Sequence, residues 1–342
     1  MDKEQQKQTV LWGILPCLVI GAAAWAMAKY IPTYGKLIGG PVFAILLGMI
    51  FAFVKRPQVL DAGITFCGKK ILQYSIIFIG FGMNIGTVLR TGGQSLLVML
   101  CTIAASLLTA YFVGKALKVP GNTATLIGVG TSICGGSAIA ATAPVIGADD
   151  EEIAQAISVI FLFNVIAALI FPTLGGVLGL SNEGFGLFAG TAVNDTSSVT
   201  AAAAAWDGMH PGANTLDTAA IVKMTRTLAI IPITLVLALL RTRREGKQGG
   251  AQVDIKKIFP WFVLLFLLAS IITTVLPIPA AAVSFLKNAS KFFIVMAMAA
   301  IGLNTDIVKL VKTGGKPIFM GFCCWVAIAG VSLLVQHLLG IW

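Results

Sequence analysis

The sequence predicts an all-α protein that crosses a membrane many times. Of its 342 residues, 57% are hydrophobic and only 11% are charged, and the mean hydropathy is +0.93. Soluble domains carry about 25% charged residues, so this composition cannot cover a surface that faces water. Apolar stretches long enough to cross the hydrocarbon core, about 20 residues in a helix, recur along the chain. A soluble enzyme, a disordered chain and a secreted disulfide scaffold are therefore excluded.

Residues 1–342 are expected to form a single integral membrane domain with about 9–11 transmembrane helices. Two apolar segments, 121–147 and 184–206, are unusually rich in Gly, Ser, Thr and Asn. If both cross the membrane, the protein has eleven spans. If both dip in and return, it has nine spans and two re-entrant hairpins. The nine clear spans are 9–30, 37–54, 71–89, 92–114, 153–179, 217–240, 258–276, 281–303 and 317–341.

Basic residues predict the orientation, because loops on the cytoplasmic side are enriched in Lys and Arg. Four basic clusters lie between predicted spans, and placing all of them in the cytoplasm puts the N-terminus inside and the C-terminus outside. The net charge of +10 then reflects topology and predicts no nucleic-acid partner. The clusters are Lys55, Arg56, Lys69 and Lys70; Lys115 and Lys118; the basic residues of the cytoplasmic loop 241–257; and Lys309, Lys312 and Lys316.

One long stretch carries no basic residue. From Val119 to Val222 there are 104 residues without Lys or Arg, and eight of the fourteen acidic residues lie there. The charge rule is therefore uninformative where the two odd segments lie. The acidic run 149–152 is expected to start the helix that follows it, because carboxylates are favoured at the positive end of a helix dipole.

Two sets of internal similarity predict inverted repeats with interrupted helices, an architecture typical of secondary transporters. Chance similarity among Gly- and Ala-rich helices is the alternative. In the first set, 82–84 and 91–93 match 302–304 and 313–315, as Gly-Met/Leu-Asn followed by Thr-Gly-Gly. In the second set, Gly130, Thr131 and Ser137 match Gly190, Thr191 and Ser197 sixty residues later.

The two interruptions themselves are the strongest functional signal. Gly and polar residues at membrane depth free backbone groups that lipid cannot satisfy, so such segments are buried in protein or line a cavity. The N-termini of the new half-helices would offer N–H groups, a positive dipole end and hydroxyl groups to an anion. The alternative is a packing role for small residues. The candidate substrate-binding residues are Ser132, Cys134, Gly135, Gly136, Ser137, Asn194, Thr196, Ser197 and Ser198.

Intramembrane charges form a second signal, because they usually mark a substrate or ion path. Lys223 and Arg226 lie three residues apart in the predicted helix 217–240, and Asp195 lies inside the second interruption. We expect Lys223 or Arg226 to supply positive charge to an anion and Asp195 to act as a coupling or gating carboxylate. A structural salt bridge between Asp195 and Lys223 is the alternative. Asn164 is expected to join helices rather than to bind substrate.

Metal and cofactor sites are not expected. The chain has two histidines, no CxxC pair and no recognisable catalytic pattern, so the sequence predicts no metal, no cofactor and no enzymatic activity.

The segments GTSICGGSAIAATAPVIGADDEEIA (130–154) and GTAVNDTSSVTAAAAAW (190–206) resemble the YeiH-like sulfate exporter family, and the similarity extends over the full chain. This resemblance implies a bacterial inner-membrane protein that exports sulfate. The segment GMNIGTVLRTGG (82–93) and the first interruption are more distantly similar to bile acid:sodium symporters. That similarity implies a core of crossed, broken helices that moves against a second panel of helices.

The observations together predict a secondary active transporter of a small anion, with sulfate or an organosulfonate as the guess that the resemblance supplies. Transport would proceed by alternating access and be coupled to H⁺ or Na⁺. A cation/proton antiporter that uses Asp195 and Lys223 is the alternative on the same scaffold, and a membrane-embedded enzyme or assembly scaffold is a third reading. The substrate, the direction of transport and the coupling ion stay open, and a homodimer is compatible with the sequence.

Overall fold

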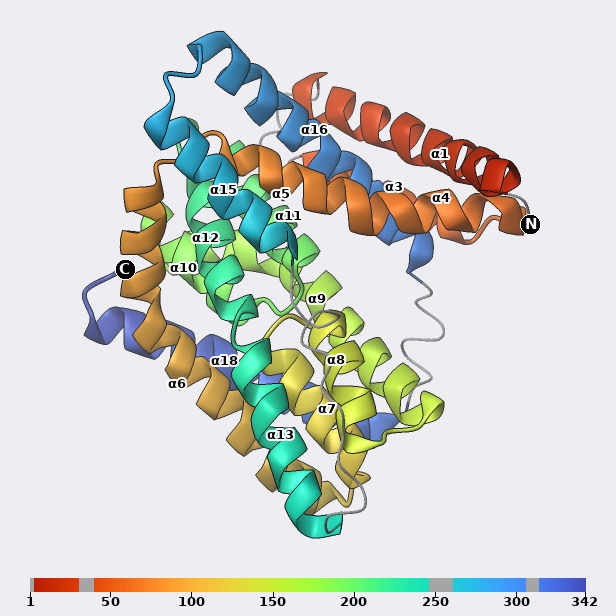
Figure 1. Ribbon diagram of the computed structural model, residues 1–342, viewed down its shortest axis with the longest axis vertical. Coiled ribbons are helices and arrows are strands. Elements are labelled where there is room, and N and C mark those ends of the chain that lie inside the picture. The colour runs from red at the N-terminus through yellow and green to blue at the C-terminus, as the bar shows by residue number, and fades with distance from the viewer. Residues whose placement is uncertain (1–2, 31–39, 246–260, 306–313) are drawn as a thin grey trace. The chain divides into compact units, whose positions relative to one another are not determined.

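The computed structural model describes residues 3–30, 40–245, 261–305 and 314–342 (Figure 1). Within these residues every regular element is a helix. Six helices are long and apolar enough to cross a membrane, judged by length and composition. Three shorter apolar helices, Gly40–Ala52, Gly136–Ile146 and Trp261–Val275, accompany them. The predicted all-α, polytopic membrane fold is confirmed.

The chain divides into two compact units, each made of three segments. The first unit comprises Met1–Arg90, Thr200–Asp217 and Trp261–Asp306, and the second comprises Thr91–Val199, Thr218–Pro260 and Ile307–Trp342. Three helices pass from one unit into the other: α6 (Ile85–Leu117), α11 (Thr196–Met209) and α12 (Thr215–Thr227).

Close glycine contacts hold the helices of the first unit together. A Cβ added to Gly48 of α3 would lie 2.9 Å from the Cα of Gly302 in α16, so only glycine lets these two backbones approach. Gly13 of α1 and Gly63 of α4 meet in the same way, at 2.6 Å. The helices of this unit are α1 (Lys3–Tyr30), α3 (Gly40–Ala52), η1 (Gln58–Leu60), α4 (Asp61–Phe66), η2 (Cys67–Ile71), α5 (Leu72–Gly80), α15 (Trp261–Val275) and α16 (Ala280–Asn304).

Arg56 joins the end of α16 to the start of α4. Its guanidinium donates to the carbonyl oxygen of Leu303 (2.6 Å) and to Oδ1 of Asn304 (2.8 Å), and it forms an ion pair with Asp61 (2.8 Å). A cation at the C-terminus of a helix satisfies carbonyl groups that have no partner within the helix.

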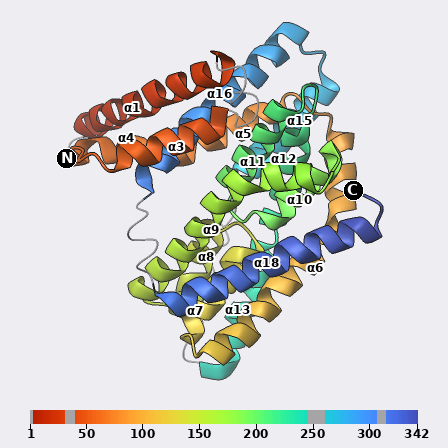
Figure 2. The same cartoon turned by 180° about the vertical axis from the view of Figure 1, so that it is seen from behind.

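The second unit is built around α9 (Asp150–Val177). Asp149 and Glu152 form a capping box at its start, so the predicted helix cap is confirmed. The helix α18 packs against α7, α9 and α10 (Figure 2). The remaining helices are α7 (Gly121–Ser132), α8 (Gly136–Ile146), α10 (Asn182–Ala192), α13 (Ile230–Glu245) and α18 (Gly315–Leu338).

The predicted boundary between spans 71–89 and 92–114 is wrong. The chain breaks at 81–84 instead, and α6 then runs without interruption through 91–93. Asn84 starts α6, because its Oδ1 accepts a hydrogen bond from the backbone N–H of Gly86 (2.7 Å). Gly92 serves a close contact: an added Cβ would lie 3.1 Å from Oγ1 of Thr225. This Thr-Gly-Gly segment is therefore helical, whereas Gly314 precedes the first residue of α18.

The predicted span 217–240 is divided between α12 and α13, which are separated by a turn at 228–229. Pro232 explains the position of the turn, because proline has no N–H and its ring clashes with the carbonyl group four residues earlier. The residue four positions before Pro232 is Leu228.

Candidate functional site

The structure contains both predicted interruptions, at equivalent positions in the two matching segments. The first, 133–135, separates α7 from α8, and the second, 193–195, separates α10 from α11. The two helix boundaries at each break recur sixty residues later: α7 ends at Ser132 and α10 at Ala192, and α8 begins at Gly136 and α11 at Thr196. In the first break Gly135 adopts φ +67°, a left-handed conformation that favours glycine.

The first interrupted segment returns to the side from which it enters. The helices α7 and α8 pack against each other, and residues from the start of α7 and the end of α8 line one cavity. Nδ2 of Asn122, at the start of α7, donates to Oε2 of Glu152 at the start of α9 (3.0 Å). Segment 121–147 is thus a helical hairpin whose two ends lie near the N-terminal end of α9.

The second interrupted segment also returns. Within the second unit, α10 and α12 run in the same direction: Leu187 and Thr218 line a small shared cavity, and an added Cβ on Gly190 would lie 2.6 Å from Cβ of Val222. This hairpin opens near the C-terminal end of α9.

Lys223 of α12 joins the tips of the two hairpins. Its side chain is fully buried, and Nζ donates to the carbonyl oxygens of Ile133 (2.7 Å), Val193 (3.3 Å) and Asn194. An ammonium group has three donors, and here all three acceptors are backbone carbonyls released where α7 and α10 end. The two breaks therefore meet around one buried cation.

Arg226 lies one turn further along α12 and caps the end of α10. Its Nη1 donates to the carbonyl oxygen of Thr191, and Nη2 donates to those of Val193 and Asn194 (3.4 Å for Asn194). Positive charge at a helix C-terminus is favourable, because it offsets the negative end of the helix dipole. Both cations thus support the breaks in this conformation. The alternative of a salt bridge between Asp195 and Lys223 is not met, since no ion pair joins these two described residues.

Asp195 is the N-cap of α11. Its Oδ2 accepts hydrogen bonds from the backbone N–H (3.0 Å) and from the hydroxyl of Ser197. The carboxylate of Asp195 therefore occupies the N-terminus of α11, where an anion would otherwise bind. At the N-terminus of α8, Gly135 has no side chain to play this part, and Ser137 is exposed. Of the two predicted half-helix N-termini, only that of α8 lacks a capping side chain.

Asn164 joins α9 to the second break, as expected of a polar residue that joins helices, and its position beside the first break as well was not expected. It lies at the middle of α9 and is 2% exposed, and its Oδ1 accepts from the backbone N–H groups of Asn194 and Asp195 (3.1 Å each). An added Cβ on Gly135 would lie 3.6 Å from its Nδ2. Asn164 therefore touches both breaks. The signal in the sequence was a polar residue at the centre of the long apolar helix that follows the acidic run 149–152.

The two breaks meet around Lys223, at a place that we call the crossing. Several polar atoms at the crossing have no hydrogen-bond partner among the described residues. They are Nδ2 of Asn164, Nδ2 and Oδ1 of Asn194, and Nε of Arg226, all on residues at most 2% exposed. Buried polar atoms are almost always paired in folded proteins, because an unpaired one costs free energy. Three donors and one acceptor are therefore available to hydrogen-bond a ligand.

The other predicted site residues lie in or beside the breaks. The hydroxyl of Ser132 donates a hydrogen bond to the carbonyl oxygen of Val129 within α7 (3.0 Å), so its proton is not available to a substrate. Cys134 and Gly135 are buried in the first break, Gly136 and Ser137 begin α8, and Thr196, Ser197 and Ser198 form the first turn of α11.

The helical fold and the paired breaks define a polytopic membrane protein with two interrupted helical segments. Residues 12–321 match the family described as Conserved hypothetical protein 698, so the chain belongs to this family. The YeiH-like resemblance concerns the same family and is confirmed to that extent.

The curated relatives are UPF0324 membrane proteins. The chain is 59% identical over 339 residues to the one from Streptococcus mutans serotype c, which covers 97% of this chain and 98% of that protein. It is 54% identical over 347 residues to FN0533 of Fusobacterium nucleatum, with 97% and 99% covered. It is 57% identical over 335 residues to M6_Spy0799 of Streptococcus pyogenes, with 96% and 97% covered. These names state a membrane location and no substrate.

Proposed function

We propose that the protein is a secondary active transporter that binds a small anion where the two breaks meet. The observation that carries the proposal is the set of unpartnered donors on Asn164, Asn194 and Arg226, which are buried beside Lys223. Donors outnumber the unpartnered acceptor three to one, as an anion site requires. Sulfate or an organosulfonate is the substrate that the family resemblance suggests.

Local charge supports an anion over a cation. Lys223 and Arg226 contribute two positive charges and Asp195 one negative charge, so the crossing carries an excess of positive charge. The N-terminus of α8 adds backbone N–H groups and the positive end of a helix dipole, and Ser137 adds a hydroxyl. An oxyanion bound between α8 and Asn164 would satisfy the donors that the protein leaves unpaired.

The opposed hairpins support alternating access. Transporters with inverted repeats bind substrate between broken helices near the bilayer midplane. Here the hairpins enter from opposite ends of α9, and Asn164 lies half-way along it, which fits an inverted pair. We propose that the unit containing both breaks moves during transport, that Asp195 couples substrate movement to H⁺ or Na⁺, and that the protein resides in a bacterial inner membrane with its N-terminus in the cytoplasm.

A cation/proton antiporter is the second candidate, because Asp195 is a carboxylate beside an unpartnered Oδ1 of Asn194. The two functions differ in what a pH gradient drives. Proteoliposomes that contain no transportable anion should show no proton flux if the anion transporter is correct. Cation-dependent proton flux under those conditions would favour the antiporter. Neither function requires a cofactor or makes the protein an enzyme.

A ligand screen tests the anion site. We expect sulfate, sulfite or a taurine-like sulfonate to raise the Tm of the purified protein saturably, while matched chloride and carboxylate salts give smaller shifts. A ligand at a hundred times its Kd stabilises the folded state by about 2.7 kcal/mol, which corresponds to a shift of several degrees. Equal shifts with every salt at equal ionic strength would mean that no specific anion site exists.

A further inference from the structure

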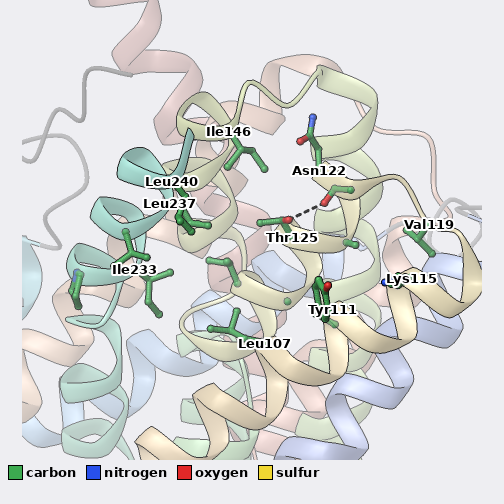
Figure 3. A pocket seen from close by; sticks show the side chains of 18 residues that line it. Leu107, Tyr111, Lys115, Val119, Asn122, Thr125, Ile146, Ile233, Leu237 and Leu240 are labelled. Carbon is green, nitrogen blue, oxygen red and sulfur yellow. Dashed lines mark hydrogen bonds between the residues drawn. The ribbon is translucent and has the colours of Figure 1, made fainter. Parts of the chain in front are cut away.

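We infer that an apolar cavity between α6, α7, α8 and α13 binds an anionic phospholipid, with an acyl chain inside the cavity and the phosphate at Lys115. The cavity has a volume of about 920 Å³ and lies entirely within the second unit. Figure 3 shows Ile233, Leu237 and Leu240 of α13 on one side and Leu107 and Tyr111 of α6 on the other. It is separate from the crossing, whose unpartnered donors do not line it.

The position of the cavity indicates an acyl chain as its content. Two of its walls belong to candidate membrane spans, Ile85–Leu117 and Thr215–Leu237. Several lining side chains are exposed: Tyr111 is 61% exposed, Val236 53% and Leu240 50%. The cavity therefore opens sideways between α6 and α13, where the surrounding medium is lipid. Water is disfavoured in a space with apolar walls, so lipid chains are the available filling.

The polar end of the cavity indicates the headgroup. Among the side chains that the structure describes, Lys115 is the one charged group that lines the cavity. Leu107 lies eight residues deeper on α6, about 12 Å along the helix. Glu152, which reaches this wall through Asn122, is already engaged by that amide (3.0 Å) and by the backbone N–H of Asp149 (3.1 Å). Lys115 forms no ion pair with any described residue, so its ammonium can meet a phosphate.

A lipid at this place would touch both the first hairpin and α13. Gly128 and Val129 line the inner part of the cavity, one turn before the break at Ile133. An acyl chain would therefore support α7 close to the crossing without contacting the substrate.

Native mass spectrometry of the full-length protein with added lipid tests this site. We expect phosphatidylglycerol to bind, and Lys115→Ala to bind it about fivefold more weakly, since a lysine near an anionic lipid surface contributes about 1 kcal/mol. Lys118→Ala is the matched control at the same helix end, because Lys118 does not line the cavity. Equal loss in both variants, or equal binding of phosphatidylcholine by the wild type, would overturn the proposal.

Filling the cavity provides a second variant that leaves the charge unchanged. A Cβ at Gly121 meets no atom within 4 Å, so Gly121→Phe can place its ring in the cavity mouth without a backbone clash. Gly330→Phe on α18 is the control, since Gly330 is equally open and lies outside the cavity. We expect Gly121→Phe to lose most of the bound phosphatidylglycerol and Gly330→Phe to keep it. Retention by Gly121→Phe would contradict the site.

Discussion

Replacing Lys223 by methionine should abolish substrate uptake into proteoliposomes and lower the Tm of the protein strongly. Methionine has a similar length but no donor, so the carbonyl groups of Ile133, Val193 and Asn194 would lose the cation that they share. Arg226 would still donate to the carbonyl oxygens of Val193 and Asn194, so the carbonyl group of Ile133 is the acceptor left without a donor, and a buried acceptor without a partner costs about 1–3 kcal/mol. The tips of the two hairpins would then lose the cation that hydrogen-bonds to both of them.

The control for this variant is Lys291→Met. Lys291 is exposed on α16 in the first unit, so its replacement should leave both Tm and uptake close to those of the wild type. Uptake by Lys223→Met at more than a tenth of the wild-type rate, in protein with an unchanged Tm, would show that Lys223 does not hold the two breaks together.

Two substitutions of Asn164 should separate its structural role from its binding role. Asn164→Asp keeps an oxygen to accept from the N–H groups of Asn194 and Asp195, so we expect a Tm close to that of the wild type. It replaces the unpartnered Nδ2 donor by an acceptor, so anion affinity should fall at least tenfold. Asn164→Leu removes both functions and should lower Tm and uptake together, because two buried N–H groups lose their acceptor.

The control for the Asn164 pair is Asn84→Asp, which exchanges the same groups at a helix N-cap that tolerates either residue. Unchanged anion affinity in Asn164→Asp would remove Asn164 from the site. A gain in cation binding by the same variant, with proton flux that needs no anion, would favour the antiporter.

The breaks themselves could be predicted from the sequence because Gly, Ser, Thr and Asn gather where an uninterrupted apolar helix would otherwise run. The glycine pair at 92–93 gave a wrong span boundary for a physical reason. Glycine in a membrane helix permits either a break or a close contact, and only the packing of Gly92 against Thr225 distinguishes the two. Sequence similarity to 313–315 could not make that distinction.

The residues of the site could be predicted from the sequence, but their hydrogen-bond partners could not. Lys223, Arg226 and Asp195 stood out because charges in apolar segments are costly. Their partners are backbone carbonyls and N–H groups, which the sequence does not identify, so a salt bridge between opposite charges was an open alternative. For Asn164 the sequence predicts only a residue that joins helices. Its position beside both breaks depends on the packing of α9, which the sequence does not show.

An anomalous difference map from crystals grown with selenate, an analogue of sulfate with a stronger anomalous signal, tests the central claim most directly. If the anion binds where the two breaks meet, a peak is expected at the crossing, within hydrogen-bonding distance of Nδ2 of Asn164 and close to the N-terminus of α8. The peak is also expected to disappear in Asn164→Asp. Selenate bound elsewhere, with the crossing empty in protein that still transports it, would contradict the account.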